Sequence, residues 1–242
     1  MKKQPFIRLL GALLCAILLV CTVACDGGAP VDPGTEDEGK TPAAATLFYT
    51  YRDYVAAAGG SFSIRSSSDL QMGQSTVRVR LYAATDGEGV YQMTEMTSDT
   101  QKMVSSHAYT DGAFRSNGTI VPISKEGYRA VYGFPTLPNP NVVQLATATV
   151  HKKLDGYLFT ASEDGRTAGA FLLGVLGREL YSLYSQATLG DVIYTFHFTH
   201  DGMLEKLDIG TEMGLDGHTI SITATLSYGD VGTAQPIPPA EF

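Results

Sequence analysis

Stretches in which apolar and polar residues alternate one by one are the feature that most constrains the fold of this chain. Residues 77–82 read Val-Arg-Val-Arg-Leu-Tyr, and residues 219–226 alternate Thr or Ser with Ile, Ala and Leu. A period of two places every second side chain on the same face of a strand. Such one-sided strands are typical of antiparallel sheets that have one face in water. The pattern therefore predicts a mainly β protein.

Turn signals separate these stretches. Asp-Gly occurs at 86, 111, 155, 164, 201 and 216, and Asn-Gly occurs at 117. Both dipeptides supply the positive φ angles that a tight hairpin turn requires. We therefore expect about eleven short strands, many of them joined consecutively as a meander.

Two segments have helical spacing instead. Thr41 is a potential N-cap, Pro42 suits the first helical position, and Gly59-Gly60 ends the segment. Between them an apolar face recurs at intervals of three and four residues, formed by Ala44, Leu47, Phe48, Tyr51, Val55 and Ala58. An N-terminal helix is predicted there.

The second helical segment, residues 166–187, is apolar on nearly all sides in its first half. Leu172, Leu176, Leu180 and Leu183 form one stripe, and its neighbours Phe171, Leu173 and Val175 widen that stripe. Such a helix is expected to be covered on several sides. Three glycines lower its intrinsic helicity, and they permit either a close approach to a sheet or movement of the segment: Gly169, Gly174 and Gly177.

The first 24 residues have the layout of a secretory signal peptide. Lys2, Lys3 and Arg8 precede an uncharged apolar stretch that runs from Leu9 to Ala24. This stretch is shorter than the ~20 apolar residues that a membrane-spanning helix needs. Residues 1–24 are therefore predicted to direct export of the chain.

The residues at the end of this segment predict a lipid anchor. Thr22-Val23-Ala24-Cys25 resembles the lipobox of bacterial lipoproteins, although Thr22 stands where that pattern usually has Leu. The resemblance implies that Cys25 carries a diacylglycerol anchor and an amide-linked acyl chain such as palmitate. The protein would then be attached to the extracytoplasmic face of the cell membrane. Ordinary cleavage after Ala24, without a lipid, is the alternative.

The three cysteines, Cys15, Cys21 and Cys25, all lie in this region. The rest of the chain therefore has no cysteine for a disulfide, a thiolate nucleophile or a metal site. Residues 25–41 are rich in Gly, Pro and acidic residues, and we interpret them as a flexible linker. Residues 42–242 suit a single domain.

Residues 34–41 match the phosphate-binding pattern G-x-x-x-x-G-K-[ST]. A working P-loop joins a buried strand to the N-terminus of a helix, so that backbone N–H groups surround the phosphates. Here no strand pattern precedes Gly34, and Glu36, Asp37 and Glu38 would repel a nucleotide. We interpret the match as part of the acidic linker and expect no nucleotide to bind.

Net charge excludes a further class of partner. The chain has a formal net charge of −8, and loss of Lys2, Lys3 and Arg8 with the signal peptide brings it to −11. Binding to nucleic acid depends on basic contacts to phosphate, so no nucleic-acid partner is expected. The sequence names no protein partner.

No residue pattern predicts catalysis, a metal or a cofactor. The nucleophile elbow G-x-S-x-G and the zinc motif H-E-x-x-H are both missing from the sequence. His197 and His200, with Asp201, suggest a metal site at first sight. A spacing of three, however, places the two histidines on opposite faces of a strand. Most aspartates have a turn-forming reason to be where they are.

The order of elements resembles a known group of bacterial proteins. An N-terminal helix, a long meander and an apolar helix before the last strands are similar to the LolA/LolB-like fold and to the LppX/LprG-type lipoproteins. Three segments carry the likeness: 108–118, 197–209 and 216–242. The resemblance implies a curved, incomplete β-barrel in residues 42–242, with the apolar helix on its concave face. No motif is specific enough to transfer a functional residue.

The resemblance suggests that a lipid or another hydrophobic ligand binds in this half-barrel. The expected lining combines one face of a strand with the apolar helix, and it consists of Phe171, Leu172, Val175, Leu176, Leu180, Tyr194, Phe196 and Phe198. Alternatively, the helix fills the concave face completely, and the protein is a non-catalytic interaction or structural module of the cell envelope. An enzyme is the third and least favoured hypothesis.

Overall fold

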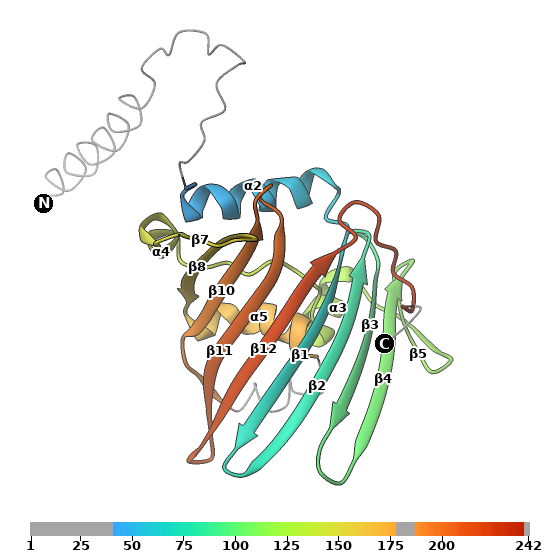
Figure 1. Cartoon of the computed structure of the whole chain (residues 1–242). Helices are drawn as coiled ribbons and strands as arrows, with labels where there is room; N and C mark the ends of the chain where they lie inside the picture. The colour runs from blue at the N-terminus through green and yellow to red at the C-terminus, as the bar shows by residue number, and fades with distance from the viewer. Residues whose placement is uncertain (1–40, 178–186, 240–242) are drawn as a thin grey trace, which may run out of the picture. The chain divides into compact units, whose positions relative to one another are not determined.

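A computed structural model describes residues 41–177 and 187–239, which belong to one compact unit, Thr41–Phe242. The described strands form a single sheet of twelve strands, in which every pairing is antiparallel. Their order across the sheet is β6-β5-β4-β3-β2-β1-β12-β11-β10-β8-β7, and β9 pairs with β11 (Figure 1). The predicted mainly β architecture is confirmed, with twelve strands in place of about eleven.

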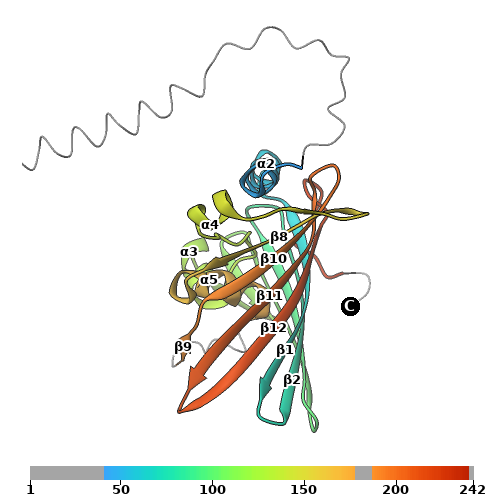
Figure 2. The same ribbon diagram turned by 60° about the vertical axis from the view of Figure 1, so that its left-hand side comes forward.

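The strand bounds are β1 (Phe62–Met72), β2 (Ser75–Thr85), β3 (Val90–Thr97), β4 (Lys102–Thr110), β5 (Ala113–Ser116), β6 (Thr119–Pro122), β7 (His151–Lys152), β8 (Gly156–Glu163), β9 (Thr188–Leu189), β10 (Val192–Thr199), β11 (Leu204–Leu215) and β12 (His218–Gly229). The sheet curves, but its end strands β6 and β7 do not pair with each other, so it does not close (Figure 2). The expected incomplete barrel is therefore what the chain forms.

The first and last long strands meet in the middle of the sheet. β1 pairs with β12 over nine registered positions, from Ser63 opposite Gly229 to Gln71 opposite Ser221. The contact continues beyond the strands, where the Ser63 hydroxyl donates to the Asp230 carboxylate at 2.6 Å. The two halves of the meander are therefore joined at a pairing between residues that are far apart in the sequence.

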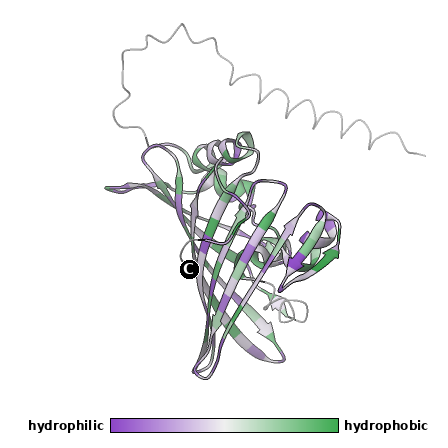
Figure 3. Ribbon diagram, turned by 90° about the vertical axis from the view of Figure 1, so that its right-hand side faces the viewer, coloured by the Kyte–Doolittle hydropathy of each residue, from purple (hydrophilic) through white to green (hydrophobic). Residues whose placement is uncertain are grey.

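The sheet has two different faces. The inner face, which the helices cover, carries Phe62, Ile64, Ser66, Ser68 and Leu70 of β1, whereas the outer face carries Arg65, Ser67 and Asp69. The alternation predicted for residues 219–226 is confirmed, because Ile220, Ile222, Ala224 and Leu226 are all buried. Hydrophobic and hydrophilic residues also alternate along neighbouring strands (Figure 3).

Three of the predicted hairpin turns have the expected backbone. Asp111, Asn117 and Asp216 all have positive φ angles, and the glycine after each has one too. Asp164-Gly165 is different, and our expectation of a hairpin turn there is wrong. The Asp164 side chain instead accepts a hydrogen bond from the Arg166 N–H at 2.9 Å and caps a helix. The dipeptide serves as an N-cap because an apolar helical run follows it directly.

Four helices are described: α2 (Ala44–Ala57), α3 (Lys125–Tyr132), α4 (Val142–Thr147) and α5 (Gly165–Leu176). α3, α4 and α5 lie on one side of the sheet, and α2 crosses one end of it (Figure 2). Within the described residues, none of the helices has the length and apolar character needed to cross a membrane.

The predicted helix starts and ends need correction. α2 begins at Ala44 after the N-cap Ala43, which has no side-chain oxygen, so Thr41 does not cap it and Pro42 precedes it. α5 ends at Leu176, because Gly177 has a φ of 93° and leaves the helical conformation. The remainder of the predicted second helix, from 178 to 186, lies outside the described residues. α3 and α4 were not predicted.

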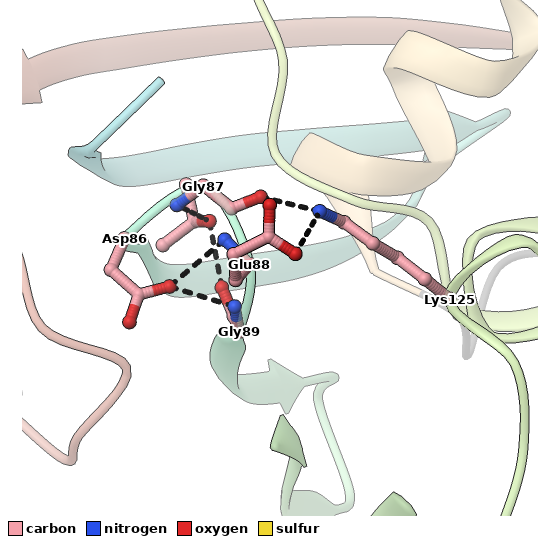
Figure 4. Close-up of polar contacts among 6 residues, drawn as sticks. Asp86, Gly87, Glu88, Gly89 and Lys125 are labelled. Atoms are coloured by element: carbon pink, nitrogen blue, oxygen red, sulfur yellow. Dashed lines mark hydrogen bonds and ion pairs between the residues drawn. The ribbon is translucent and has the colours of Figure 1, made fainter. Parts of the chain in front are cut away.

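The turn between β2 and β3 ties the sheet to two helices (Figure 4). The Asp86 carboxylate accepts from the Glu88 and Gly89 N–H groups at 3.0 and 2.7 Å. The Lys125 ammonium, at the start of α3, donates to the Gly87 carbonyl at 2.6 Å and to the Glu88 carboxylate at 3.1 Å. A Cβ atom on Gly87 would lie 2.1 Å from the Gly59 carbonyl oxygen, just after α2. Only glycine fits there.

This contact predicts a difference between two glycine substitutions. Gly73 and Gly87 both have positive φ angles, but a Cβ at Gly73 would meet no atom within 4 Å. Gly73→Ala should therefore cost roughly 1–2 kcal/mol of unfolding free energy, from backbone conformation alone. Gly87→Ala adds an overlap with backbone and should cost about 3 kcal/mol or more. Urea unfolding of both variants measures this; equal losses would contradict the predicted contact with Gly59.

Candidate functional site

The predicted ligand-lining residues that the structure describes lie in one buried cluster on the inner face of the sheet. Phe171, Leu172, Val175 and Leu176 lie on α5, and Tyr194, Phe196 and Phe198 lie on β10. All seven belong to one buried cluster, with exposed fractions between 0% and 5%. Leu180 lies outside the described residues. The structure thus places these side chains together, as parts of a closely packed core.

Three local contacts hold α5 in position. Asp164 caps its first turn, as described above. Near the other end, the Ser66 hydroxyl of β1 donates to the Val175 carbonyl at 2.7 Å and is itself buried. Gly174 lets the chain at Phe134 approach, since a Cβ at 174 would lie 2.6 Å from the Phe134 carbonyl oxygen. Of the two roles that the sequence allowed for the glycines, Gly174 serves close packing.

Aromatic rings fill the space between the sheet and the helices. Phe171 meets Tyr194 edge-on, with ring centroids 5.8 Å apart. Phe196 stacks on Phe159 of β8 at 4.9 Å and meets Phe48 of α2 at 5.5 Å. Rings at these separations gain favourable contacts beyond their buried area. The described part of this inner-face region is therefore closed by the chain's own side chains.

A buried carboxylate borders the cluster, and no sequence pattern predicted it. Glu163, at the end of β8, is 5% exposed and accepts a hydrogen bond from the Tyr194 hydroxyl at 2.8 Å. The Asn139 N–H also donates to Glu163, at 3.3 Å. Burial, and after it the nearby Glu163 charge, raises the pKa of Tyr194 far above its ordinary value. Tyr194 therefore stays protonated and acts as a donor, not as a base.

The outer face carries a polar network around Asp208 of β11. The Asp208 carboxylate accepts from Lys206 at 2.9 Å and from the Thr225 hydroxyl at 2.7 Å, and it lies 2.8 Å from the His197 Nε2. Partial burial raises the pKa of Asp208, but the hydrogen bonds from Lys206, Thr225 and His197 outweigh this and hold the pKa below its ordinary value. The aspartate is therefore ionised and engaged at neutral pH.

The two histidines considered for a metal have separate partners. His197 contacts Asp208, whereas the Nε2 of His200 lies 3.1 Å from the Leu154 carbonyl oxygen. The described ranges contain no group of three or more His, Cys, Asp or Glu side chains placed to hold a metal ion.

Shallow polar hollows cross the outer face at the centre of the sheet. One, of about 400 Å³, is lined by residues of β1, β11 and β12 that include Ser67, Asp69 and Thr225. A second, of about 240 Å³, shares Ser67 and Thr225 and adds Arg65 and Arg80. Short hydroxyl side chains between longer charged ones produce these hollows.

Several predicted features lie outside the described residues. These are the signal peptide, the acyl-bearing Cys25, the linker up to Lys40, and with it nearly all of the P-loop-like match.

Comparison with known proteins assigns no family. No family model matches the chain, and no curated protein matches it in sequence. Among solved structures, a porin-like protein from Bacteroides uniformis is 10% identical, with 72% of this chain and 97% of that chain covered and a TM-score of 0.28.

Two further solved structures are weaker matches. A protein described as an oleoyl thioesterase from Lactobacillus plantarum is 12% identical, with 76% of this chain and 86% of that chain covered and a TM-score of 0.13. The dehydratase domain of the CurH module of curacin polyketide synthase is 8% identical, with 78% and 82% covered and a TM-score of 0.14. The neighbours are rich in β structure, and TM-scores this low carry no function across.

The Glu163–Tyr194 contact yields a matched pair of substitutions. Tyr194→Phe removes one donor from a buried carboxylate and should cost about 1–3 kcal/mol of unfolding free energy. Tyr228 is also buried, but its hydroxyl has no hydrogen-bond partner among the described residues. Tyr228→Phe should therefore leave stability unchanged or raise it. Thermal unfolding of both variants measures the difference, and an equal loss in both would show that the carboxylate does not depend on Tyr194.

Proposed function

We propose that this protein is a non-catalytic interaction module of the cell envelope, anchored to the membrane through a lipid on Cys25. Its apolar trough, which is the concave inner face of the sheet, is filled by its own helix α5. The packing of α5 carries this proposal. Leu172, Val175 and Leu176 are fully buried against the inner face, at 0% exposed. A trough that is already filled leaves the protein's solvent-facing surfaces to meet a partner.

The size of the buried surface favours a filled trough over one that opens. Full burial of one large apolar side chain stabilises by about 1.5–3 kcal/mol. Withdrawing Phe171, Leu172, Val175 and Leu176 from the sheet would therefore cost roughly 6–12 kcal/mol. The whole stability of a domain is about 5–15 kcal/mol. A ligand that entered by displacing α5 would have to replace nearly all of these contacts, which favours the filled trough.

The outer face is the surface we assign to the partner. Its hollows run over β1, β11 and β12, and several of its charged groups pair within the face, as Lys206 does with Asp208 and Arg78 with Asp69. A face of hydroxyls and paired charges suits hydrogen bonding more than attraction to a strongly charged polymer. The absence of a nucleophile–base pair from the sequence patterns supports a non-catalytic role.

Binding of a hydrophobic ligand is the second candidate function. It follows from the resemblance to LolA/LolB-like and LppX/LprG-type lipoproteins, and the lining predicted from the sequence stays a prediction. The observation that favours a ligand lies in another part of the inner face, on β3, where the polar groups of Gln92 and Thr94 are buried and have no partner among the described residues.

Adding bulk to α5 tests whether the trough is filled. Val175→Trp should lower the unfolding free energy by about 1–3 kcal/mol, because the closed core has no room for an indole. Ala170→Trp, on the exposed side of the same helix, is the control and should change stability by less than about 0.5 kcal/mol. If Val175→Trp leaves stability unchanged but removes a lipid that co-purifies with the wild type, the trough holds a ligand and the proposal is wrong.

Substitution of the predicted lipid-bearing residue tests the anchor. The lipobox-like pattern places the acylated residue at Cys25, and two or more acyl chains attach a protein stably, at ~0.8 kcal/mol per buried CH₂. Cys25→Ala should therefore block lipoprotein processing and abolish labelling of the protein with radioactive palmitate. Cys21→Ala is the matched control and should be processed and labelled like the wild type. Palmitate labelling that survives in Cys25→Ala would contradict the assignment.

A further inference from the structure

On the inner face over β2, β3 and β4, two neighbouring cross-strand rows of side chains carry polar groups. The strand registers place two rows with polar groups next to each other: Ala83–Gln92–His107 and Leu81–Thr94–Ser105. The rows on each side of this pair are mainly apolar: one is Thr85–Val90–Tyr109 and the other is Val79–Met96–Met103. This band is therefore more polar than the rows beside it.

Two polar side chains of this band, Gln92 and Thr94, are buried without internal partners. Gln92 is 0% exposed and Thr94 is 2% exposed. Within the described part of the chain, neither the amide nitrogen nor the amide oxygen of Gln92 has a hydrogen-bond partner, and the Thr94 hydroxyl has none. Leaving such groups unsatisfied costs free energy, so nearly all buried polar groups in proteins are paired. A group that is not among the described residues, a water molecule or a ligand atom, would satisfy them.

A third group of the same kind comes from α3. Tyr128 is 0% exposed, and its hydroxyl also has no partner among the described residues. Its ring packs 5.2 Å from that of Tyr109 and 5.9 Å from that of His107, so it lies over the β4 end of the band. A helix and a strand thus contribute hydroxyl and amide groups to one region of the inner face.

We propose that Gln92, Thr94 and Tyr128 bind the uncharged polar group of an amphiphile, a hydroxyl or an ester carbonyl. Each of the three side chains is neutral and offers both a donor and an acceptor. The inner-face positions of β2, β3 and β4 include no Lys, Arg, Asp or Glu, and burying an unpaired ionic head group there would be costly. The site therefore selects against carboxylates, phosphates and ammonium groups.

We assign the apolar part of the amphiphile to the row of apolar side chains beside the band. Met96 lies next to Val79 on one side and Met103 on the other, and Met103 is 49% exposed. Methionine side chains adapt their shape to apolar groups of different form. The row thus runs from an exposed residue of β4 to the position on β3 that lies two residues after Thr94, on the same face. This site is separate from the α5 packing, so it goes beyond the proposed function and stands or falls independently of it.

A titration with ligands that differ only in their head group tests the proposal. The protein used is residues 26–242, which contain the compact unit Thr41–Phe242 but neither the signal segment nor the acylated cysteine, and its methionine methyl groups are labelled with ¹³C. We expect 1-decanol to shift the Met96 and Met103 methyl signals in a saturable way. Decanoate and decyltrimethylammonium should bind at least about tenfold more weakly. Failure of decanol to saturate these signals, or equal binding of decanoate, would overturn the proposal.

Apolar substitutions of similar shape separate ligand binding from a structural role. Thr94→Val and Gln92→Met should each weaken decanol binding about tenfold, with no fall in the melting temperature, since the groups they remove have no internal partner. Tyr228→Phe is the control, because it removes another buried unpartnered hydroxyl outside the band and should bind decanol like the parent. Unchanged decanol binding in both band variants would contradict the proposal. A lower melting temperature in both would mean that the polar groups serve the fold.

Discussion

The pairing of β1 with β12 is the interaction on which the rest of the structure depends. It joins Ser63 to Gly229 and Gln71 to Ser221 at the centre of the sheet, so neither half of the meander has a complete set of neighbours without it. Pairings between residues this far apart close a long loop and form slowly. Contacts beyond the strands support the pairing, since the Gly232 N–H donates to the Ser61 carbonyl at 2.9 Å. The described residues contain no cysteine, so no disulfide among them supports this long-range strand pairing.

The open edges of the sheet explain why helices are needed. A curved sheet that does not close leaves its apolar inner face without a second sheet to cover it, so helices must supply the cover. α5 does this over β1 and β2, and α2 and α4 extend the same core. The Gly174 contact with Phe134 and the Ser66 hydrogen bond to Val175 hold α5 at a fixed distance from the sheet. Covering the inner face with α5 therefore stabilises the fold and also limits what can enter the trough.

The fold class could be predicted from the sequence because the patterns that indicate it involve residues close together in the chain. Alternation in 219–226 and positive φ at Asp111, Asn117 and Asp216 arise from neighbouring residues, and the structure agrees with both. Helices α3 and α4 were missed because they are short, although Ser124 and Asn141 cap them as such residues usually do. The Glu163–Tyr194 bond spans 31 residues, and the cross-strand neighbours of Gln92, Ala83 and His107, come from two other strands. Local patterns carry no information about such contacts.

The two regions of the inner face differ for a reason that the strand registers make visible. On β10 each inward position is an aromatic side chain, from Tyr194 to Phe198, and helices supply apolar partners of matching size. On β3 the inward positions change from Val90 to Gln92 and Thr94 before they return to Met96. Two polar side chains in the interior of a strand weaken the core unless something satisfies them. A fold that needed only a filled trough would gain stability from apolar residues at both positions, so their presence is best explained by a partner that they bind.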